Sequence, residues 1–451
     1  MKAGDTVFVR GGTYNALTTF PHSGSAGGGY ITFENYPGET ATVDGTGLTI
    51  PGGQAGLFTL DSASYLVIEG FQLQNYSTSK LSQVPIGIYI TGAGSNVQIV
   101  NNTIHDIDTN AATNPSQCGS NAFGMTVYGT KAPQAVDGLA VAGNEIFHTR
   151  TGCSETLSLD GNVEHFAVVD NLVHDVNNIG IGAIGFEGVS PNPAFDQARH
   201  GVIRGNTVFN ITSFGNPDYG KQYAADGIYV DGGTAITIEQ NLVRNVDLGI
   251  ELASEHKGHV TSYVTVRNNL IYSGNSAGLS IGGYGAARGG TDHCTVVNNT
   301  LYDNDIKKTG SGEFQIQYHA TNNVFENNIL YAGPQNLFLH DFTTSTPDPA
   351  AIDFNLYYAL AGAAKGVWDW QHVRYAGYAK YLSATGLDAD SPAFSDPLFI
   401  SAGAPPGLDI APSSPAAGTG TPLGTAITGS VDFAGNRRVR SGKINIGAYE
   451  K

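Results

Sequence analysis

Apolar residues recur along the chain at fixed positions relative to a series of asparagines. The asparagines are Asn102, Asn144, Asn171, Asn206, Asn241, Asn269, Asn299 and Asn328. The third residue before each asparagine is apolar, from Ile99 to Phe325, and so is the second residue after it, from Ile104 to Leu330. Self-similarity at a nearly constant period of about 30 residues predicts a solenoid in which each repeat forms one coil.

The two apolar columns stand on opposite sides of the asparagine, and their odd separation breaks the two-residue alternation of a single strand. The backbone must therefore turn a corner at or near the asparagine. Asparagine tolerates left-handed backbone angles and can hydrogen-bond to the next asparagine in a stack. We therefore predict that the asparagine column is structural.

A second kind of strand follows the asparagine and begins with glycine. It is seen at Gly180, Gly249 and Gly278, and after a longer insert at Gly227. Two or three short strands per coil, with Gly and Asn at the corners, predict an all-β fold, a parallel β-helix. We expect residues 1–342 to form the β-helix body and residues 343–451 to form irregular C-terminal strands and a cap packed on the last coils.

Three inserts interrupt the body, at residues 109–120, 190–199 and 213–225. Long inserts in a compact fold are often functional, and the loop that begins at Phe214 directly precedes Asp226, so we expect it to form the wall of a groove. The chain has three cysteines. Cys118 and Cys153 lie in neighbouring repeats and could form a disulfide, which leaves Cys294 unpaired.

Composition narrows the classes of partner. The chain has a formal net charge of −17 and no basic run, which argues against nucleic acid because phosphate contacts need Lys and Arg. No apolar stretch of about 20 residues is present, so we expect no membrane segment. The chain begins abruptly at Lys2, as if a leader were missing. A neutral ligand is easier to accept than a nucleic acid, and we expect a monomer.

The two ends of the sequence carry a family resemblance. The opening from Gly4 to Tyr14, followed by Ile31 to Glu39, and the ending Asp432-Phe-Ala-Gly-Asn-Arg with Gly442 to Glu450 resemble the right-handed parallel β-helix proteins of the pectate-lyase-like superfamily. The resemblance implies a right-handed coil and a secreted carbohydrate-active enzyme. It does not fix the reaction, because the superfamily includes lyases, hydrolases, epimerases and phage tailspikes.

The glycine-initiated strands also align the candidate catalytic residues. The alignment gives one outward column of Ser158, Gly182, Tyr229, Glu251 and Ser280, and a second of Asp160, Ile184, Asp231, Ala253 and Gly282. Asp231 and Glu251 then lie on adjacent coils with their Cα atoms about 8 Å apart. Such a pair suits the acid and base of a glycosidase, in either retaining or inverting geometry. Glu255, on the turn after the strand, could replace either member.

Other polar residues around this pair are candidate substrate ligands. They are Tyr229, Asp160, Glu187, Asp226, His256, Lys257, Tyr284 and Arg288. Tyr284 could stack on a sugar ring and Arg288 could bind a hydroxyl or a carboxylate. The structural alternative is that these acids solvate a surface and bridge coils, and that Asp226 satisfies turn amides. His105 and His174 belong to a column of mostly aromatic residues, so we interpret them as stacked side chains rather than metal ligands.

These observations favour a glycoside hydrolase that cuts a mainly neutral polysaccharide with Glu251 and Asp231 or Glu255, a reaction that requires no cofactor. The first alternative is a polysaccharide lyase. In that reaction Lys257, Arg288, Lys221 or His256 would abstract the C5 proton of a uronate, and Arg or Ca²⁺ would neutralise its carboxylate. The second alternative is a non-catalytic, glycan-binding β-helix. The sequence leaves any metal ligands unidentified.

Overall fold

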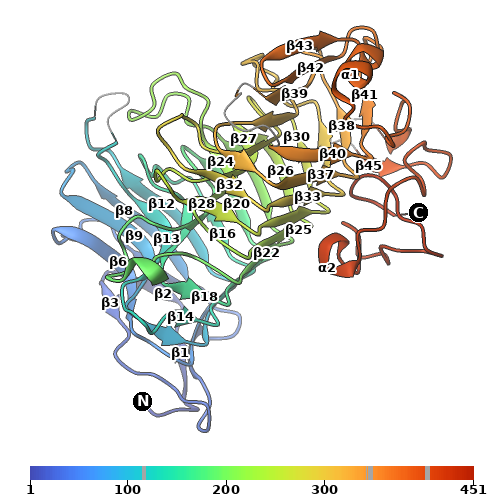
Figure 1. The fold of residues 1–451 in the computed structure, drawn as a ribbon. Helices are drawn as coiled ribbons and strands as arrows, with labels where there is room; N and C mark the ends of the chain where they lie inside the picture. Colours follow the sequence, from blue (N-terminus) through green and yellow to red (C-terminus); the bar gives the residue numbers. More distant parts are fainter. Residues whose placement is uncertain (114–117, 342, 344–348, 402–406, 451) are drawn as a thin grey trace. The chain divides into compact units, whose positions relative to one another are not determined.

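The computed structural model describes residues 1–113, 118–341, 343, 349–401 and 407–450. Residues 114–117 of the first predicted insert and residue 342, the predicted limit of the body, lie outside the described residues. The chain divides into two compact units, unit 1 (Met1–Tyr229) and unit 2 (Val230–Lys451). Each unit is built of short parallel strands that pair from one coil to the next (Figure 1).

Each regular coil of unit 1 contributes one strand to each of three sheets, which we call A, B and C in chain order. Sheet A contains β1 (Thr6–Val9), β4 (Ile31–Asn35), β7 (Leu66–Glu69), β11 (Val97–Val100), β15 (Ala140–Ala142), β19 (Ala167–Val169) and β22 (Val202–Arg204). Sheet B contains β2 (Gly12–Tyr14), β5 (Ala41–Asp44), β8 (Gln72–Thr78), β12 (Thr103–Thr109), β16 (Glu145–Phe147), β20 (Leu172–Val176) and β23 (Thr207–Ile211).

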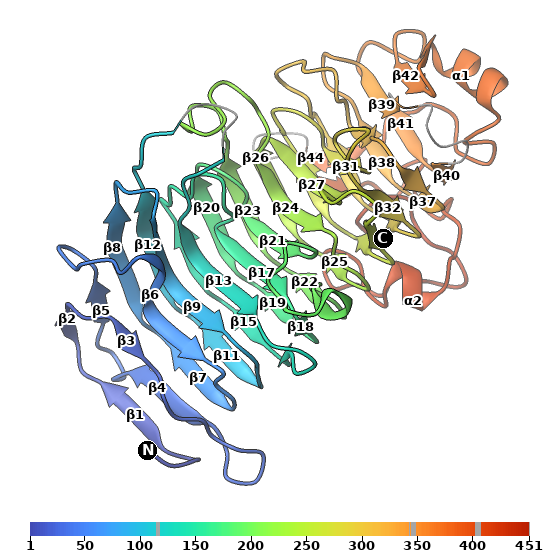
Figure 2. The same ribbon diagram turned by 60° about the vertical axis from the view of Figure 1, so that its left-hand side comes forward.

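In sheet C of unit 1 the strands of successive coils lie side by side (Figure 2), and β21 is preceded by the predicted Gly180. Its strands are β3 (Thr18–Thr19), β6 (Gly53–Asp61), β9 (Gln83–Thr91), β13 (Phe123–Gly129), β17 (Leu157–Gly161) and β21 (Ile181–Ile184). A fourth, short sheet consists of β10 (Gly94–Ser95), β14 (Val136–Asp137) and β18 (Val163–Glu164), and the 3-10 helix η1 (Pro193–Phe195) lies in the second predicted insert.

Unit 2 repeats the same order of strands. Its sheet A strands are β25 (Thr237–Glu239), β29 (Thr265–Arg267), β33 (Thr295–Val297), β37 (Asn323–Glu326) and β40 (Ala350–Asp353). Its sheet B strands are β26 (Leu242–Val246), β30 (Leu270–Tyr272), β34 (Thr300–Tyr302), β38 (Ile329–Tyr331) and β41 (Leu356–Tyr358). Its sheet C strands are β27 (Leu248–Ala253), β31 (Leu279–Ile281), β35 (Phe314–Ile316), β39 (Leu337–Asp341) and β42 (Val367–Trp370).

The remaining elements of unit 2 are a short parallel sheet and the C-terminal cap. The short sheet is formed by β28 (Val260–Ser262), β32 (Gly290–Asp292) and β36 (Ala320–Thr321). The cap contains β43 (Val373–Ala376), α1 (Tyr378–Thr385), β44 (Phe399–Ser401), β45 (Gly407–Ile410) and α2 (Thr425–Thr428). β24 (Asp226–Asp231) contributes its first residues to unit 1 and its last two to unit 2.

The predicted columns form the core of each unit. In unit 1, Ile99 and Val141 of sheet A and Ile104 and Ile146 of sheet B have no exposed surface. The aromatic column of sheet B is stacked as predicted, with ring centroids of His105 and Phe147 4.8 Å apart. Phe147 and His174 follow at 5.1 Å, with nearly parallel rings. The all-β fold and the inward columns are therefore confirmed.

The predicted asparagine ladder is present in both units. In unit 2 the Nδ2 of Asn241 donates to Oδ1 of Asn269 over 3.0 Å, and that of Asn269 donates to Asn299 over 2.9 Å. The left-handed corner residue is the one before the ladder asparagine, for example Asn298 (φ 56°) and Asn327 (φ 58°). The ladder asparagine is thus free to turn its amide into the coil, where it caps the neighbouring backbone.

Parallel pairing continues beyond residue 342, the predicted limit of the body. β40 pairs with β37 and β41 with β38, and β42 is parallel to β39, whereas β43 is antiparallel to β42. Trp368 and Tyr381 are buried together with their rings stacked 5.2 Å apart. The strands up to Trp370 therefore still belong to the coils, and these two aromatic residues cover the last coil instead of offering a surface to sugars.

Candidate functional site

Glu251 lies on the outer face of sheet C in unit 2. Its neighbours Ile250 and Leu252 on β27 point inward and have no exposed surface. The Glu251 side chain therefore points outward, because successive side chains of a strand alternate between faces. Glu251 pairs with Ser280 on β31, as the alignment predicted, and Ser280 pairs in turn with Gln315 on β35.

Asp231 lies on the same face. The Gly232 N–H donates to the carbonyl of Ala253 over 3.0 Å, which in a parallel ladder sets Asp231 beside Ala253. Asp231 is then one strand across and two residues along from Glu251. With about 4.8 Å between strands and about 6.6 Å between alternate residues, the Cα atoms lie about 8 Å apart. The predicted juxtaposition of these two carboxylates is therefore consistent with the backbone register.

Glu251 is held by a residue that the sequence did not single out. Nε2 of Gln317 donates to Oε1 of Glu251 and also, over 2.6 Å, to Oγ of Ser280. Gln317 is buried and follows β35, where the strand does not begin with glycine. Extending the two outward columns by one more coil, through the Phe-Gln-Ile-Gln segment, would have found Gln315 and Gln317.

Asp231 is shielded by the turn that follows β27. Only 2% of Asp231 is exposed, and its Oδ1 accepts the backbone N–H of Glu255 over 2.8 Å. A ring nitrogen of His256 lies within 4.8 Å of an Asp231 carboxylate oxygen. Glu255 and His256 are half-buried, whereas Lys257 is exposed. The turn thus brings two carboxylates and an imidazole together beside Glu251.

Tyr284 and Arg288 lie beside the same carboxylates. The Arg288 guanidinium lies over the Tyr284 ring at 4.7 Å, and its Nη1 donates to the Glu255 carbonyl over 3.4 Å. Partial burial raises the pKa of the Tyr284 phenol, and the negative charges of Glu255 and Asp231 raise it further. Both side chains are largely exposed, so they could contact a ligand lying over the carboxylates. We call Asp231, Glu251, Glu255, Tyr284 and Arg288 the sheet-C site.

The remaining predicted ligands belong to unit 1. Asp226 and Tyr229 on β24 are buried, whereas Glu187 and Lys221 are exposed. Asp160 on β17 is 6% exposed, and burial raises its pKa well above the ordinary range, helped by the charges of Glu155, Glu187 and Asp196. Roles for these residues in substrate binding stay predictions.

Glu155 is a second residue that the sequence analysis passed over. A Cβ placed on Gly182 would lie 2.8 Å from Cγ of Glu155, so the glutamate side chain covers this glycine. Glu155 also raises the pKa of Asp160. Only the absence of a side chain at residue 182 indicated in advance that a neighbouring side chain could occupy this space.

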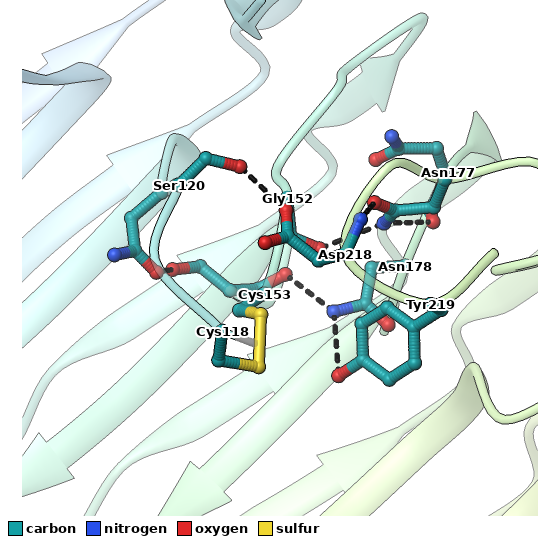
Figure 3. Close-up of a disulfide and its surroundings, with 11 residues drawn as sticks. Cys118, Ser120, Gly152, Cys153, Asn177, Asn178, Asp218 and Tyr219 are labelled. Atoms are coloured by element: carbon teal, nitrogen blue, oxygen red, sulfur yellow. Dashed lines mark hydrogen bonds between the residues drawn. A yellow bond between two sulfur atoms is a disulfide. The ribbon is translucent and has the colours of Figure 1, made fainter. Parts of the chain in front are cut away.

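The predicted disulfide is present. Cys118 and Cys153 are joined, with their Cα atoms 5.5 Å apart, and Cys294 is free and buried. Figure 3 shows the disulfide among residues of three connecting segments, including Ser120, Gly152 and Asp218. No helix among the described residues is long and apolar enough to cross a bilayer.

Comparison with known proteins identifies the family. Residues 194–345 match the family model described as right handed beta helix region. Over 398 residues the chain is 36% identical to "Uncharacterized protein YwoF" of Bacillus subtilis (strain 168), which covers 88% of this chain and 82% of the relative. The chain belongs to the YwoF family. The match to the family model and the parallel coils show that the fold is the right-handed parallel β-helix that the resemblance to the pectate-lyase-like superfamily implied.

Solved structures with the fold of this YwoF-family chain are remote in sequence. Pectate lyase Pel9A is 14% identical with a TM-score of 0.51, over 100% of this chain and 89% of its own. A mannuronic acid specific family 6 polysaccharide lyase from human gut microbiota is 14% identical with a TM-score of 0.51, over 80% of this chain and 81% of its own. The GH136 lacto-N-biosidase of Eubacterium ramulus is 12% identical with a TM-score of 0.54, over 80% of this chain and 62% of its own. At these identities the likeness concerns the fold.

Proposed function

We propose that this protein is a carbohydrate-active enzyme that hydrolyses a glycosidic bond at the sheet-C site of unit 2. The observation that carries the proposal is the placement of Glu251 and Asp231 on one face of sheet C, two residues and one strand apart. Carboxyl groups at such positions can reach the separations of about 5–9.5 Å found in retaining and inverting glycosidases. Neighbours with the same fold include a lacto-N-biosidase, which supports a hydrolase without deciding it.

Glu251 and Asp231 have complementary surroundings. Glu251 is half-buried and oriented by the amide of Gln317. Asp231 is covered by the turn that carries Glu255 and His256. We assign Glu251 and Asp231 as the groups that donate a proton to the leaving oxygen and activate the attacking group. Glu255, whose backbone is fixed by Asp231, would complete the site. Tyr284 and Arg288 would contact the sugar, through ring stacking and hydrogen bonds to hydroxyls.

A polysaccharide lyase is the second candidate, because basic side chains accompany the acids. His256 and Lys257 lie on the turn after β27, and Arg288, on the turn after β31, donates to the Glu255 carbonyl. His256 beside Asp231 could accept the C5 proton of a uronate, and Arg288 could pair with its carboxylate. Ca²⁺ could serve in this reaction, and the Asp231 carboxylate would supply one of the oxygen ligands that this ion prefers. Pel9A and the mannuronic acid specific lyase share the fold, which is compatible with this alternative.

A panel of neutral and uronate polysaccharides tests both candidates, assayed with Ca²⁺ and with a chelator. Hydrolysis releases reducing ends without absorbance near 235 nm, whereas β-elimination produces an unsaturated sugar that absorbs there. We expect reducing ends without absorbance, in chelator as in Ca²⁺. If absorbance near 235 nm appears and is lost in chelator, the reaction is that of a lyase and the hydrolase proposal is wrong. If no glycan gives reducing ends or absorbance, the protein is a non-catalytic, glycan-binding β-helix.

A further inference from the structure

Unit 1 contains a groove along the C-terminal part of its sheet B strands, and none of the residues that line it belongs to the sheet-C site. A hollow of about 590 Å³ is lined by residues of β12, β20 and β23 and of the segments that follow β16, β20 and β23. A second hollow of about 520 Å³ is lined by the segment that follows β5 and by residues of β8 and β12. Both include Asp106 and Asp108, so they are continuous. Volumes of about 300–1,000 Å³ are typical of small-molecule sites.

The lining of the groove is polar, with one exposed aromatic ring. We call Asp106, Asp108, His148, Arg150, Asp175 and Phe214 the loop groove. Phe214 is 46% exposed, and its ring is stacked on Tyr223 with centroids 5.0 Å apart. Since Tyr223 supports one face of the Phe214 ring, the ring is fixed in place before any ligand binds. An exposed, preordered aromatic ring beside several carboxylates is an arrangement that suits sugar rings and their hydroxyls.

The three aspartates of the loop groove, Asp106, Asp108 and Asp175, outnumber its one arginine, Arg150. Asp106 is paired with Nδ1 of His105 over 2.5 Å, and Asp175 with Nδ1 of His174 over 2.6 Å. Oδ1 of Asp108 accepts the backbone N–H of Arg150 over 2.9 Å. The carboxylates accept hydrogen bonds and the Arg150 guanidinium can donate them, so the groove offers both donors and acceptors. This combination suits a neutral, hydroxyl-rich ligand better than a polyanion.

A single metal ion is a poorer fit. Among the described residues, no three His, Cys, Asp or Glu side chains of the loop groove bring ligand atoms within 4.8 Å of one another. Ca²⁺ takes six to eight oxygen ligands at about 2.3–2.6 Å, which requires such convergence. The carboxylates of the groove are spread over successive coils instead, like acceptors for the hydroxyls of an extended ligand.

The wall that carries Phe214 is fixed to the coils beneath it. Asn216 donates from Nδ2 to the carbonyl of Gly152 over 2.8 Å and to that of Asn177 over 2.9 Å. The Oγ of Ser120 donates to Asp218 over 2.6 Å, close to the disulfide between Cys118 and Cys153 (Figure 3). The predicted wall loop does border a groove, but the groove lies at the end of sheet B.

We propose that the loop groove of unit 1 is a second carbohydrate site, which binds a neutral oligosaccharide with Phe214 as the stacking surface and Asp106, Asp108 and Arg150 as hydrogen-bonding partners. It shares no residue with the sheet-C site and does not depend on the reaction catalysed there. In this role the groove holds a glycan chain without cleaving it.

Calorimetric titration of the Glu251→Gln protein, in which cleavage at the sheet-C site is suppressed, tests the proposal. The probes are cello-, xylo-, manno- and laminari-hexaose, with chitosan and alginate hexamers and CaCl₂ for comparison. At least one neutral hexaose should bind, and hydrogen exchange should show protection of residues 207–216. Phe214→Ala should weaken that binding about 10-fold, the order expected for one stacked ring. Asp108→Asn should weaken it less.

Phe8→Ala is the matched control, because Phe8 in unit 1 is 48% exposed and lies outside the groove. It should bind like its parent. The proposal is overturned if no neutral hexaose binds, if Phe214→Ala and Phe8→Ala bind alike, or if residues 207–216 are protected only by alginate, chitosan or CaCl₂. A folded state of each variant is checked by its melting temperature. Loss of activity at the sheet-C site leaves these readouts unchanged, so the two proposals fail separately.

Discussion

The sheet-C site and the loop groove use different parts of the coil to present their acids. In the sheet-C site, Glu251 and Asp231 stand on or next to strands, where the ladder of backbone hydrogen bonds fixes their spacing. In the loop groove, Asp106 and Asp175 occupy left-handed corner positions within β12 and β20 of sheet B, with φ of 55° and 54°. Strand positions give fixed separations suited to bond cleavage. Corner positions give a row of repeated acceptors suited to holding an extended ligand.

The largest expected effect comes from removing the strand-borne acid. Glu251→Gln keeps the shape of the side chain but removes a group that accepts or donates a proton, and such groups contribute about 10²–10⁴ in rate. We expect kcat to fall by about 10³ on the polysaccharide found by the panel. Initial rates of reducing-end release measure it.

Glu326→Gln is the control for that substitution. Glu326 is also a half-buried glutamate of unit 2, but it lies on β37 of sheet A. It should keep its activity. A Glu251→Gln protein that retains more than about a tenth of the wild-type rate would remove Glu251 from the catalytic pair, since general acid–base groups contribute more than this.

The second largest effect is expected on the stability of unit 1 when the disulfide, which closes a long loop, is removed. The sequence separation of Cys118 and Cys153 is 35 residues. A cross-link over such a loop stabilises by about 3–4 kcal/mol through the unfolded chain. The double substitution of Cys118 and Cys153 by Ser should lower the free energy of unfolding of unit 1 by this amount, measured by urea denaturation followed by hydrogen exchange of residues 207–216.

Activity at the sheet-C site should survive the loss of the disulfide, which would sharpen the contrast between the two regions. A reducing agent should reproduce the loss of stability in the wild-type protein and have no effect on the double variant. Equal stability of reduced and oxidised wild-type protein would show that the disulfide does not hold the wall of the loop groove.

A smaller effect concerns the protonation of Asp108. Burial raises its pKa to about 6, and the negative charge of Asp106 adds to this, while the Arg150 backbone N–H and the charges of Arg150 and His148 oppose it. The folded state therefore holds a proton more tightly than the unfolded state. Stability from this group is present below pH 4 and is lost as pH rises toward 6. Asp108→Asn should thus stabilise the protein by about 1–2 kcal/mol above pH 7.

Urea denaturation at pH 4 and pH 7.5 measures this difference. The asparagine keeps an oxygen that can accept the Arg150 N–H, so no hydrogen bond is lost. At pH 4 the variant and the wild-type protein should be equally stable. A variant that is less stable at both values would mean that the Asp108 carboxylate is stabilised in the groove, contrary to the effect of burial.

The repeat of the coils was predictable from the sequence because apolar residues and asparagines recur at fixed positions in each coil. Site residues were predictable only where acids fall in such a column of aligned positions. Glu251 and Asp231 were found because they fall in register with Ser280 and Ala253. Gln317 was missed because its strand does not start with glycine, so the aligned column stopped one coil short. Asp106 and Asp175 were missed because they follow His105 and His174, which were interpreted only as stacking residues. Side-chain direction at a left-handed corner is not fixed by alternation, so the sequence alone could not assemble the loop groove.

The smallest effect is expected at Tyr284, whose hydroxyl lies among the charges of the sheet-C site. Tyr284→Phe keeps the ring under Arg288 and removes only the hydroxyl, whose pKa is raised by burial and by Glu255 and Asp231. If the ring stacks on sugar and the hydroxyl positions Glu255, kcat should fall about 5-fold, equivalent to one hydrogen bond of about 1 kcal/mol, with KM unchanged. Tyr284→Ala should in addition raise KM, because the stacking surface is lost. Steady-state kinetics of the two variants separate these effects, and an unchanged KM in Tyr284→Ala would place the sugar away from this ring while leaving Glu251 and Asp231 in their assigned roles.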